Sequence, residues 1–328
     1  MTKRFDLITI GGATEDLSVL LSDYRLIDNQ QDFLAKKLLA IEYGAKTIVK
    51  ESFVEYGGGA ANLAVAAQRC GLKVASLIAI GDDRRSQDIV ANLKTNKINT
   101  NLIQTIAGQQ SAMSIVLIGQ DGEHTIITYR GANDLLKINR TIAKQWNSGW
   151  LYISSLSGAQ WLKNLTAIFA SGKQIAWNPG QLQLAAGLAK LQPFLRKTDI
   201  LIVNQDEALQ LLASHKAEKR RLADYSKNID QLIRRLWYYG PKLLIVTADS
   251  RGTWAYDGQQ LIHQPAYPVK KIIDTTGVGD AFGGTLVAGL IKTNNLKKSL
   301  RLAAQQSASV LTQRGAQSGL LNLTKRLR

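Results

Sequence analysis

Residues 274–284 read DTTGVGDAFGG: two threonines, a glycine turn, one carboxylate and then an apolar run. Gly277 and Gly279 allow the backbone to take positive φ and to bring amide N–H groups close to a ligand. The apolar run predicts a helix that begins at this turn. The start of a helix adds free N–H groups and the positive end of the helix dipole. The stretch therefore predicts an anion-binding site suited to a phosphoryl group.

Asp280 is the unusual residue of this turn, because a carboxylate repels a phosphate rather than binding it. It makes chemical sense as a general base that takes a proton from an alcohol attacking a phosphoryl group held by the neighbouring amides. The alternative is that Asp280 only caps the helix, and spacing alone leaves both interpretations open. No GK[ST] follows the glycines and they do not open the first strand–helix unit, so neither a Walker loop nor a dinucleotide fingerprint is predicted.

The rest of the chain mostly alternates short apolar runs with helical patterns. Nearly continuous apolar runs are typical of strands in a parallel sheet with helices on both faces. We expect strands within 5–12, 73–81, 150–155, 173–178, 199–204 and 242–248, helices within 60–71, 159–171, 181–197 and from about 205, and a hairpin over 253–264 that turns at Asp257-Gly258. This order predicts an α/β fold with an open, mainly parallel sheet sandwiched by helices.

Two regions depart from that alternation. Residues 111–133 hold two alternating runs around Asp121-Gly122, which is a strong hairpin signal. Residues 45–59 alternate as well. Together they predict a small β-sheet that stands off the main sheet, built from segments of about 13–56 and 100–130.

The chain is basic, with 41 Lys and Arg against 25 Asp and Glu and a formal net charge of +16. The densest basic stretch, 215–237, mixes in acids and repeats apolar residues near helical spacing, so we interpret it as an outer amphipathic helix and do not expect a nucleic-acid partner. No run approaches the length of a membrane span, and no membrane partner is expected. The single Cys70 fits a reducing compartment, so we place the protein in the cytoplasm. No linker divides residues 1–328, which should form one domain.

DTTGVGDAFGG resembles the D-T-x-G-A-G-D signature of the ribokinase-like carbohydrate kinases, the PfkB family. YGGGAANLAVAAQRCG at 56–71 resembles the family's G-G-x-x-x-N turn, and IGDD at 80–83 resembles its V-G-x-D. NQDE at 204–207 matches N-x-x-E at the end of a strand, and VTADSRG at 246–252 resembles V-T-x-G-x-x-G. The motifs occur in family order over almost the whole chain. The resemblance implies the ribokinase-like fold, with the small sheet acting as a lid.

The resemblance also implies roles for the residues of two motifs. In the first, Asp280 becomes the catalytic base, and Gly277, Val278 and Gly279 form the anion hole. Asp274 shapes the same turn, in a region that holds a monovalent cation such as K⁺ in some family members. In the N-x-x-E motif, Asn204 and Glu207 help to position Mg²⁺ and phosphate, often through water. A carboxylate and an amide at the end of a strand suit such a hard, hydrated cation.

The acceptor alcohol is bound, by the same resemblance, through the N-terminal half. Asp16 in GGATED matches an aspartate that follows the first strand, and a carboxylate accepts two hydrogen bonds from vicinal hydroxyls. Gly58 and Asn62 match the glycine and asparagine that contact the sugar. Arg130 and Asn133 in TYRGAN are further candidates, since some members with charged or nucleoside substrates use an arginine near this point.

The nucleotide is expected beside Thr247 and Gly252, which belong to the V-T-x-G-x-x-G motif, with adenine between that loop and the last helices near Ala308 or Gln305. The chain departs from the family pattern in three places. Asp249 replaces a glycine of the nucleotide loop, Ser86 replaces the last glycine of G-x-D-x-x-G, and the spacer from Gly12 to Gly57 is longer than in compact ribokinases.

These residues predict an ATP- and Mg²⁺-dependent kinase that phosphorylates a hydroxymethyl group of a sugar. A nucleoside kinase of the same fold is the alternative, and it would need an aromatic base pocket for which Phe53, Tyr56 and Tyr129 are candidate walls. A sugar-phosphate or acid-sugar kinase is a third option that needs Arg130 and a lysine, and a non-catalytic binding protein on a kinase scaffold is a fourth. Related kinases often pair their lids, so a homodimer is expected through this sheet.

Overall fold

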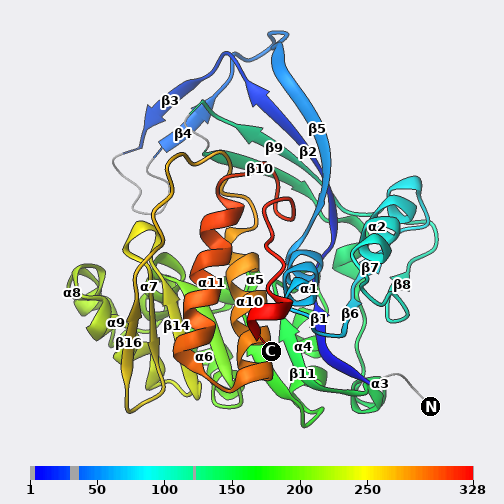
Figure 1. Cartoon of the computed structure of the whole chain (residues 1–328). Helices are drawn as coiled ribbons and strands as arrows, with labels where there is room; N and C mark the ends of the chain where they lie inside the picture. The colour runs from blue at the N-terminus through cyan, green and yellow to red at the C-terminus, as the bar shows by residue number, and fades with distance from the viewer. Residues whose placement is uncertain (1–3, 30–36, 121–122, 328) are drawn as a thin grey trace.

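A large sheet forms the centre of the molecule (Figure 1). The computed structural model describes residues 4–29, 37–120 and 123–327, and within them eight strands make this sheet. In spatial order they are β16 (Leu261–Gln264), β15 (Thr253–Tyr256), β14 (Leu243–Thr247), β13 (Ile200–Asn204), β12 (Gln174–Trp177), β11 (Ser148–Ile153), β1 (Phe5–Ile10) and β6 (Val74–Leu77). The strands from β14 to β6 are parallel, and β15 and β16 add an antiparallel hairpin at one edge.

Helices cover both faces of the sheet, because successive residues of a strand point to opposite faces. In β1, Ile8 and Ile10 join the core on one face and Leu7 joins the core on the other. The first face is covered by α3 (Arg140–Gln145), α4 (Trp161–Phe169), α5 (Gln181–Ala186), α6 (Leu188–Leu195), α7 (Gln205–Ala213), α8 (Leu222–Lys227) and α9 (Ile229–Trp237), and the second by α1 (Gly59–Arg69), α2 (Arg84–Thr95), α10 (Val278–Thr293) and α11 (Leu296–Val310). The α/β sandwich predicted from the sequence is therefore confirmed.

The helix expected over 181–197 is two helices that meet at Gly187. Gly187 has φ 83° and ψ 161°, a conformation that an α-helix cannot contain and that glycine adopts at little cost. The new helix start is satisfied from outside, since the N–H of Leu188 donates to Ser214 Oγ at 2.8 Å. The apolar pattern continued through the break, which is why periodicity alone did not reveal it.

The basic stretch 215–237 is also not one helix, because α8 and α9 follow one another after a short 3-10 turn. Glu218 organises this region although it is only 1% exposed. It accepts hydrogen bonds from Tyr225 at 2.9 Å and Tyr239 at 2.7 Å and pairs with Arg235. The bond from Arg235 is the largest cause that lowers the pKa of Glu218 to about 2. Part of the basic charge thus serves a buried ion pair rather than an outer surface.

A smaller sheet stands beyond the carboxyl ends of the parallel strands, at the top of Figure 1. Its strands, in order, are β10 (His124–Tyr129), β9 (Met113–Ile118), β2 (Thr14–Leu21) and β5 (Val49–Gly57). β2 pairs antiparallel with β5 and parallel with β9, and β9 pairs antiparallel with β10. The predicted small sheet is confirmed, while its expected turn at Asp121-Gly122 lies outside the described residues.

The long spacer between Gly12 and Gly57 contains a further hairpin that the sequence did not reveal, β3 (Arg25–Asp28) with β4 (Lys37–Ala40). The strand expected over 73–81 divides into β6 and the short β7 (Ala79–Ile80), which pairs with β8 (Gln104–Thr105). No helix in the described part of the chain is long and apolar enough to cross a membrane.

Candidate active site

The glycine turn of 274–284 forms the start of α10, with Gly277 as the residue before the first helical turn. Gly277 has φ 72°, the left-handed region that favours glycine, and a Cβ there would lie 2.3 Å from Cβ of Ala316. A Cβ at Gly279 would meet nothing within 4 Å, so open space lies beside this residue. The N–H groups of Gly279 and Asp280 have no hydrogen-bond acceptor among the described residues. Of the predicted anion hole, Gly279 therefore keeps a free donor, whereas the N–H of Val278 donates to the carbonyl oxygen of Thr275 at 3.5 Å.

Asp280 is the third residue of α10 and reaches across to α1. Its Oδ2 accepts a hydrogen bond of 2.9 Å from Nδ2 of Asn62, a residue that is 5% exposed. Its Oδ1 lies toward the start of α1, 3.7 Å from the position that a Cβ of Gly59 would occupy. Burial is the largest influence on Asp280 and raises its pKa to about 6, while the Asn62 bond opposes the rise and the charge of Asp16 adds to it. A carboxylate with this pKa is suited to accept a proton near neutral pH.

Asp16 approaches the same place from the small sheet. In the strand register it lies opposite Glu55 on β5 and Ser114 on β9, so these side chains share one face, which we call the inner face. Hydrogen bonds from Thr14 and Ser114 lower the pKa of Asp16, but burial, which is the larger effect, raises it. A Cβ at Gly57 would lie 2.0 Å from Asp16 Oδ2, so the glycine motif is needed for the carboxylate to fit.

Gly58 has less freedom to contact a ligand than its motif suggested, because a Cβ there would lie 2.6 Å from the Cα of Ala13. This close approach joins the start of α1 to the segment that connects β1 and β2. Asp16, Gly58, Asn62 and Asp280, which are far apart in the sequence, are thus brought to one region at the carboxyl end of the parallel strands. That is where open α/β sheets bind their ligands.

Asn204 and Glu207 meet in a reciprocal cap at the start of α7. Asn204 Oδ1 accepts the N–H of Glu207 at 2.8 Å, and Glu207 Oε2 accepts the N–H of Asn204 at 2.8 Å. Burial raises the pKa of Glu207. The pKa of Tyr152, which is 1% exposed, is raised mainly by its burial and further by the charges of Asp280 and Glu207. Tyr152 therefore lies close enough to both Asp280 and Glu207 for their charges to affect it.

The nucleotide loop begins at the end of β14, where Thr247 is the register partner of Asn204. Asp249, at the position of the family glycine, has φ 45°, which explains why glycine suits this position. A Cβ at Gly252 would lie 2.3 Å from the carbonyl oxygen of Gln264, so only glycine fits. On α11, Gln305 donates to the Tyr267 hydroxyl at 3.0 Å, and Ala308 is partly buried.

The structure shows the surroundings of Asn133 and Arg130, two of the residues predicted to bind the acceptor. The side-chain amide of Asn133 binds the backbone of Ala13 at both ends. Oδ1 of Asn133 accepts the N–H of Ala13 at 3.3 Å, and Nδ2 of Asn133 donates to the carbonyl oxygen of Ala13 at 3.1 Å. The residue therefore holds the β1–β2 connection in position. Arg130 is exposed at the end of β10, and no contact among the described residues brings it to Asp16 or Asp280. Ser86 fits its position easily, because its N–H donates to Asp83 Oδ1 at 3.1 Å at the start of α2.

Asp274 is buried, at 2% exposure, and ties two loops together. Its Oδ1 accepts the N–H of Thr276 at 2.8 Å, and its Oδ2 accepts the N–H of Gly315 at 2.8 Å. Thr276 Oγ1 is buried close by without a hydrogen-bond partner among the described residues. Asp274 therefore fixes the segment 313–318, which we call the C-terminal loop, against the glycine turn.

Sequence reasoning missed the contribution of this C-terminal loop. Arg314 pairs with Glu51 and lies over the Phe53 ring, with 5.4 Å between the guanidinium carbon and the ring centroid. A Cβ at Gly315 would fall within 1.7 Å of Glu55 Oε1, so the carboxylate is seated directly on the glycine. Burial raises the pKa of Glu55 to about 7, and the charges of Asp274 and Asp16 add to this effect. The register of β2 and β5 was the available signal for Glu55.

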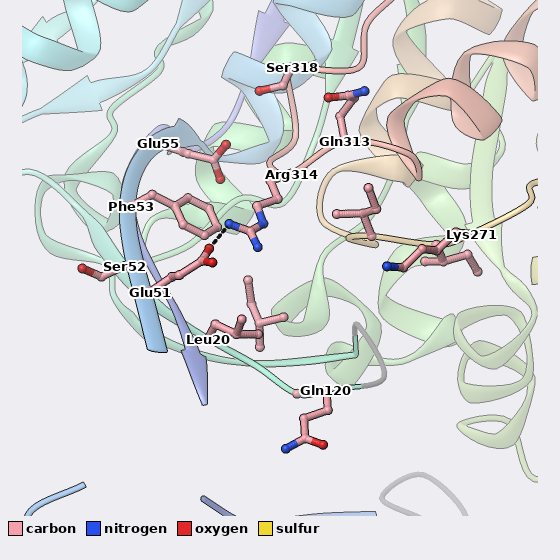
Figure 2. A pocket seen from close by; sticks show the side chains of 14 residues that line it. Leu20, Glu51, Ser52, Phe53, Glu55, Gln120, Lys271, Gln313, Arg314 and Ser318 are labelled. Atoms are coloured by element: carbon pink, nitrogen blue, oxygen red, sulfur yellow. Dashed lines mark hydrogen bonds and ion pairs between the residues drawn. The ribbon is translucent and has the colours of Figure 1, made fainter. Parts of the chain in front are cut away.

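A cavity of about 930 Å³ opens between the inner face of the small sheet and the C-terminal loop (Figure 2). Figure 2 shows Arg314 projecting into it toward Glu51, with Glu55 and Phe53 beside the pair and Lys271 across the opening. Of the residues that the sequence analysis singled out, only Phe53, a candidate wall of a base pocket, lines this cavity. Glu55, which lines it, lies opposite Asp16 in the strand register.

The parallel sheet, the small sheet and a helix start with free donors beside a carboxylate together define a ribokinase-type kinase fold. The model of the pfkB family carbohydrate kinases matches residues 26–323. The chain therefore belongs to that family, and it is a phosphotransferase that acts on an alcohol group.

Known proteins agree with this assignment. Ribokinase of Mus musculus is 29% identical over 255 residues, which cover 75% of this chain and 74% of the mouse protein. The structure of Arabidopsis thaliana ribokinase complexed with ribose and ATP covers 99% of both chains, with a TM-score of 0.77 and 18% identity. The structure of a Burkholderia thailandensis nucleoside kinase in complex with inosine covers 98% of this chain and 95% of its own, with a TM-score of 0.75 and 18% identity. At such identities the structural likeness shows the fold alone.

Proposed function

We propose that the protein is an ATP-dependent kinase that transfers the γ-phosphoryl group to a hydroxymethyl group of a sugar. The observation that carries this proposal is the geometry of Asp280. One carboxylate oxygen is held by Asn62, the other is available, and free N–H groups of the helix start lie beside it. A base and an anion hole within one helical turn are what an in-line transfer to an alcohol requires.

In this mechanism the acceptor hydroxyl lies between Asp16 and Asp280. Asp16 accepts hydrogen bonds from neighbouring hydroxyls of the sugar, which orients the reacting one. Asp280 accepts the proton as the oxygen attacks the γ-phosphorus of ATP, and the bond from that phosphorus to the bridging oxygen breaks so that ADP leaves. The pKa of about 6 leaves Asp280 ionised at neutral pH. The N–H groups of Gly279 and Asp280 then stabilise the charge on the moving phosphoryl group. The small sheet acts as a lid that excludes water from this step.

A Mg²⁺ ion at this site would be held mostly by phosphate and water oxygens rather than by protein side chains. Asn204 and Glu207 offer an amide and a carboxylate, but the cap they share already engages the only side-chain oxygen of Asn204 and one of the two of Glu207. Within the described residues no group of three or more His, Cys, Asp or Glu could hold a metal ion. Asn204 and Glu207 would therefore act through water on Mg²⁺ that the ATP phosphates carry, and the ion would neutralise phosphate charge. A monovalent cation such as K⁺ would lie near Asp274, where Thr276 Oγ1 is left without a partner.

The inner face favours a sugar over a nucleoside. Asp16 is followed across the sheet by Ser114 and then Thr128, whose hydroxyls lie 3.5 Å apart, and this polar row suits hydroxyl groups. Of the three candidate walls for a base pocket, Tyr56 and Tyr129 fall on the opposite, outer face by register. Only Phe53 shares the inner face, and Arg314 covers its ring. A sugar-phosphate acceptor finds no support in the exposed Arg130.

The outer face supports the expected homodimer through the lid. Val54, Ile127 and Tyr129 lie there at 54%, 56% and 49% exposure, a set of apolar side chains that a second copy of the sheet would cover. The cytoplasmic location stays a prediction that rests on the single, buried Cys70.

The test measures ATP turnover with Mg²⁺ over a panel of ribose, fructose, adenosine, cytidine and sugar phosphates, with Asp280→Asn beside the native protein. We expect one free sugar to stimulate turnover and the substitution to lower it by about 10²- to 10⁴-fold, the usual contribution of a general base. If a nucleoside stimulates turnover instead, the result would support a nucleoside kinase of the same fold. Undiminished phosphorylation by Asp280→Asn would refute the mechanism.

A further inference from the structure

The hydrogen bond from Asn62 to Asp280 is the last link of a longer chain of side chains. The links are Arg69 Nη2 to Asn96 Oδ1 at 3.3 Å, Asn96 Nδ2 to Asn92 Oδ1 at 3.3 Å, Asn92 Nδ2 to Gln317 Oε1 at 3.1 Å, Gln317 Nε2 to Asn62 Oδ1 at 3.0 Å and Asn62 Nδ2 to Asp280 Oδ2 at 2.9 Å. Four carboxamides thus connect a guanidinium to the candidate base. They join α1, α2, the C-terminal loop and α10.

The two ends of the chain give every link the same direction. A guanidinium has only donors, so Arg69 requires the oxygen of Asn96 to face it, and the NH₂ group of Asn96 must then face Asn92. An ionised carboxylate only accepts, so Asp280 requires the NH₂ group of Asn62. Each amide between them accepts on one side and donates on the other. No amide in the chain can turn over without placing oxygen against oxygen or NH₂ against NH₂.

This direction has a consequence at the reacting carboxylate. Because Gln317 occupies the oxygen of Asn62, the asparagine is held with its NH₂ group toward Asp280 Oδ2. Oδ1 is then the oxygen that remains for the acceptor hydroxyl, on the side of Gly59. An Asn62 without Gln317 could rotate its oxygen toward the carboxylate, which would repel Asp280 instead of binding it.

We propose that Gln317 and Asn92 are positioning residues, which hold Asn62 so that it donates to Asp280 Oδ2 and leaves Oδ1 to take the acceptor proton. Neither residue touches the reacting atoms, so both act through Asn62. The proposal rests on the proposed function in one respect only, the role of Asp280 as the base. The hydrogen-bond chain itself can be tested whether or not that role holds.

Other groups around Asp280 set its pKa as well, and the test must separate them. Asp16 faces it from β2 and raises the pKa by charge, and burial raises it further. Tyr152 faces it from β11 and stays neutral, since its own pKa is raised by burial and by the charges of Asp280 and Glu207. Asn62 is the group that lowers the pKa of Asp280. A neutral substitution within the hydrogen-bond chain therefore changes only the effect by which Asn62 lowers the pKa of Asp280.

The experiment titrates the full-length protein by NMR with ¹³C-labelled aspartate carboxyl groups, and Asp280→Asn assigns the Asp280 signal. Gln317→Met keeps the length of the side chain and removes both links. We expect it to raise the pKa of Asp280 by about one pH unit, the size of a hydrogen bond to a charged group. Asn92→Leu cuts the chain one link further away and should produce a smaller rise in the same direction. Gln68→Met, on α1 with no side-chain hydrogen bond among the described residues, is the matched control and should leave the pKa unchanged.

Steady-state kinetics with the acceptor that stimulates ATP turnover supply a second measurement. Gln317→Met should lower kcat about tenfold with little change in KM, and it should move the acid limb of the pH profile upward with the NMR value. An unchanged Asp280 pKa in Gln317→Met, or an equal change in Gln68→Met, would overturn the proposal. If the pKa rises as expected while Asp280→Asn keeps its activity, the chain is confirmed as a positioning device and the proposed role of Asp280 fails instead.

Discussion

Helices α7 and α10 both begin near the carboxyl edge of the sheet, and both carry an acid as their third residue. In α7, Glu207 bends back to the N–H of Asn204, and Asn204 returns the bond. In α10 the residue before the helix is Gly277, which has no side chain to return one. Asp280 extends to Asn62 instead, and the N–H groups of Gly279 and Asp280 have no acceptor among the described residues.

The difference shows that an acid at the third helical position does not by itself indicate a structural or a catalytic role. The residue before the helix differs between the two. Asn204 and Glu207 close the start of α7 on itself. Gly277 has no side chain to offer Asp280, which bonds Asn62 instead, and the N–H groups of Gly279 and Asp280 stay without an acceptor among the described residues.

We expect the largest effect from Gly277→Ala, which changes the residue before α10. The alanine would adopt a left-handed φ and its Cβ would lie 2.3 Å from that of Ala316, so the turn must shift. We expect activity to fall at least about 10²-fold, as when one donor of an anion hole is lost, and stability to fall by about 1–3 kcal/mol. Thermal unfolding and turnover measured on the same sample check both effects. Gly149→Ala, at a glycine with open space around it, is the control and should change neither.

Glu207 has two expected roles, capping α7 and positioning Mg²⁺, and two substitutions can separate them. Glu207→Ala removes the cap and should cost about 1 kcal/mol of stability. Glu207→Gln keeps a side chain that can accept the Asn204 N–H and removes only the charge, so stability should be retained. If Glu207 also positions Mg²⁺, Glu207→Gln should raise the Mg²⁺ concentration needed for half-maximal turnover about tenfold while stability is retained. An unchanged Mg²⁺ requirement would leave Glu207 with the capping role alone.

The smallest effect concerns the stability cost of an ionised Asp280. Its pKa in the folded protein is about 6, above the ordinary 3.8, so folding favours the protonated form. The penalty for burying the charged form is absent below pH 3.8, grows as the pH rises and is complete above about pH 6. Asp280→Asn should therefore stabilise the protein by on the order of 1 kcal/mol at pH 8, with partial solvent exposure limiting the gain, and the gain should disappear near pH 3.5. Denaturant unfolding of both proteins at the two pH values measures this difference.

The sequence was a good guide to the sheet and to Asp280 because both depend on local patterns. Apolar runs predicted the parallel strands, and the glycine turn predicted the start of α10. The resemblance added Asp16 and Asn62, which the fold then brought close to Asp280. These residues could be chosen from the sequence because each belongs to a motif with a fixed place relative to a strand or a helix.

The features that escaped prediction depend on contacts between distant segments. Gly187 breaks a helix whose apolar period continues, and the start of α6 relies on Ser214, the residue that follows α7. Glu55 gains its environment from Gly315, and Gln317 gains its role from Asn62 on α1. Asn133 hydrogen-bonds the backbone of Ala13, a contact that its motif did not reveal. Periodicity within one segment carries no information about such partners.

Four successive residues of the C-terminal loop each contact a different part of the site. Arg314 reaches Glu51, Gly315 receives Glu55 and donates to Asp274, Ala316 abuts Gly277, and Gln317 holds Asn62. The insertion or deletion of one residue here would move every one of these contacts by a full position at once. This loop is therefore a poor place for tags, fusions or permuted ends, although Arg314 is exposed. Variation in its length is expected to be far rarer than variation in its exposed side chains.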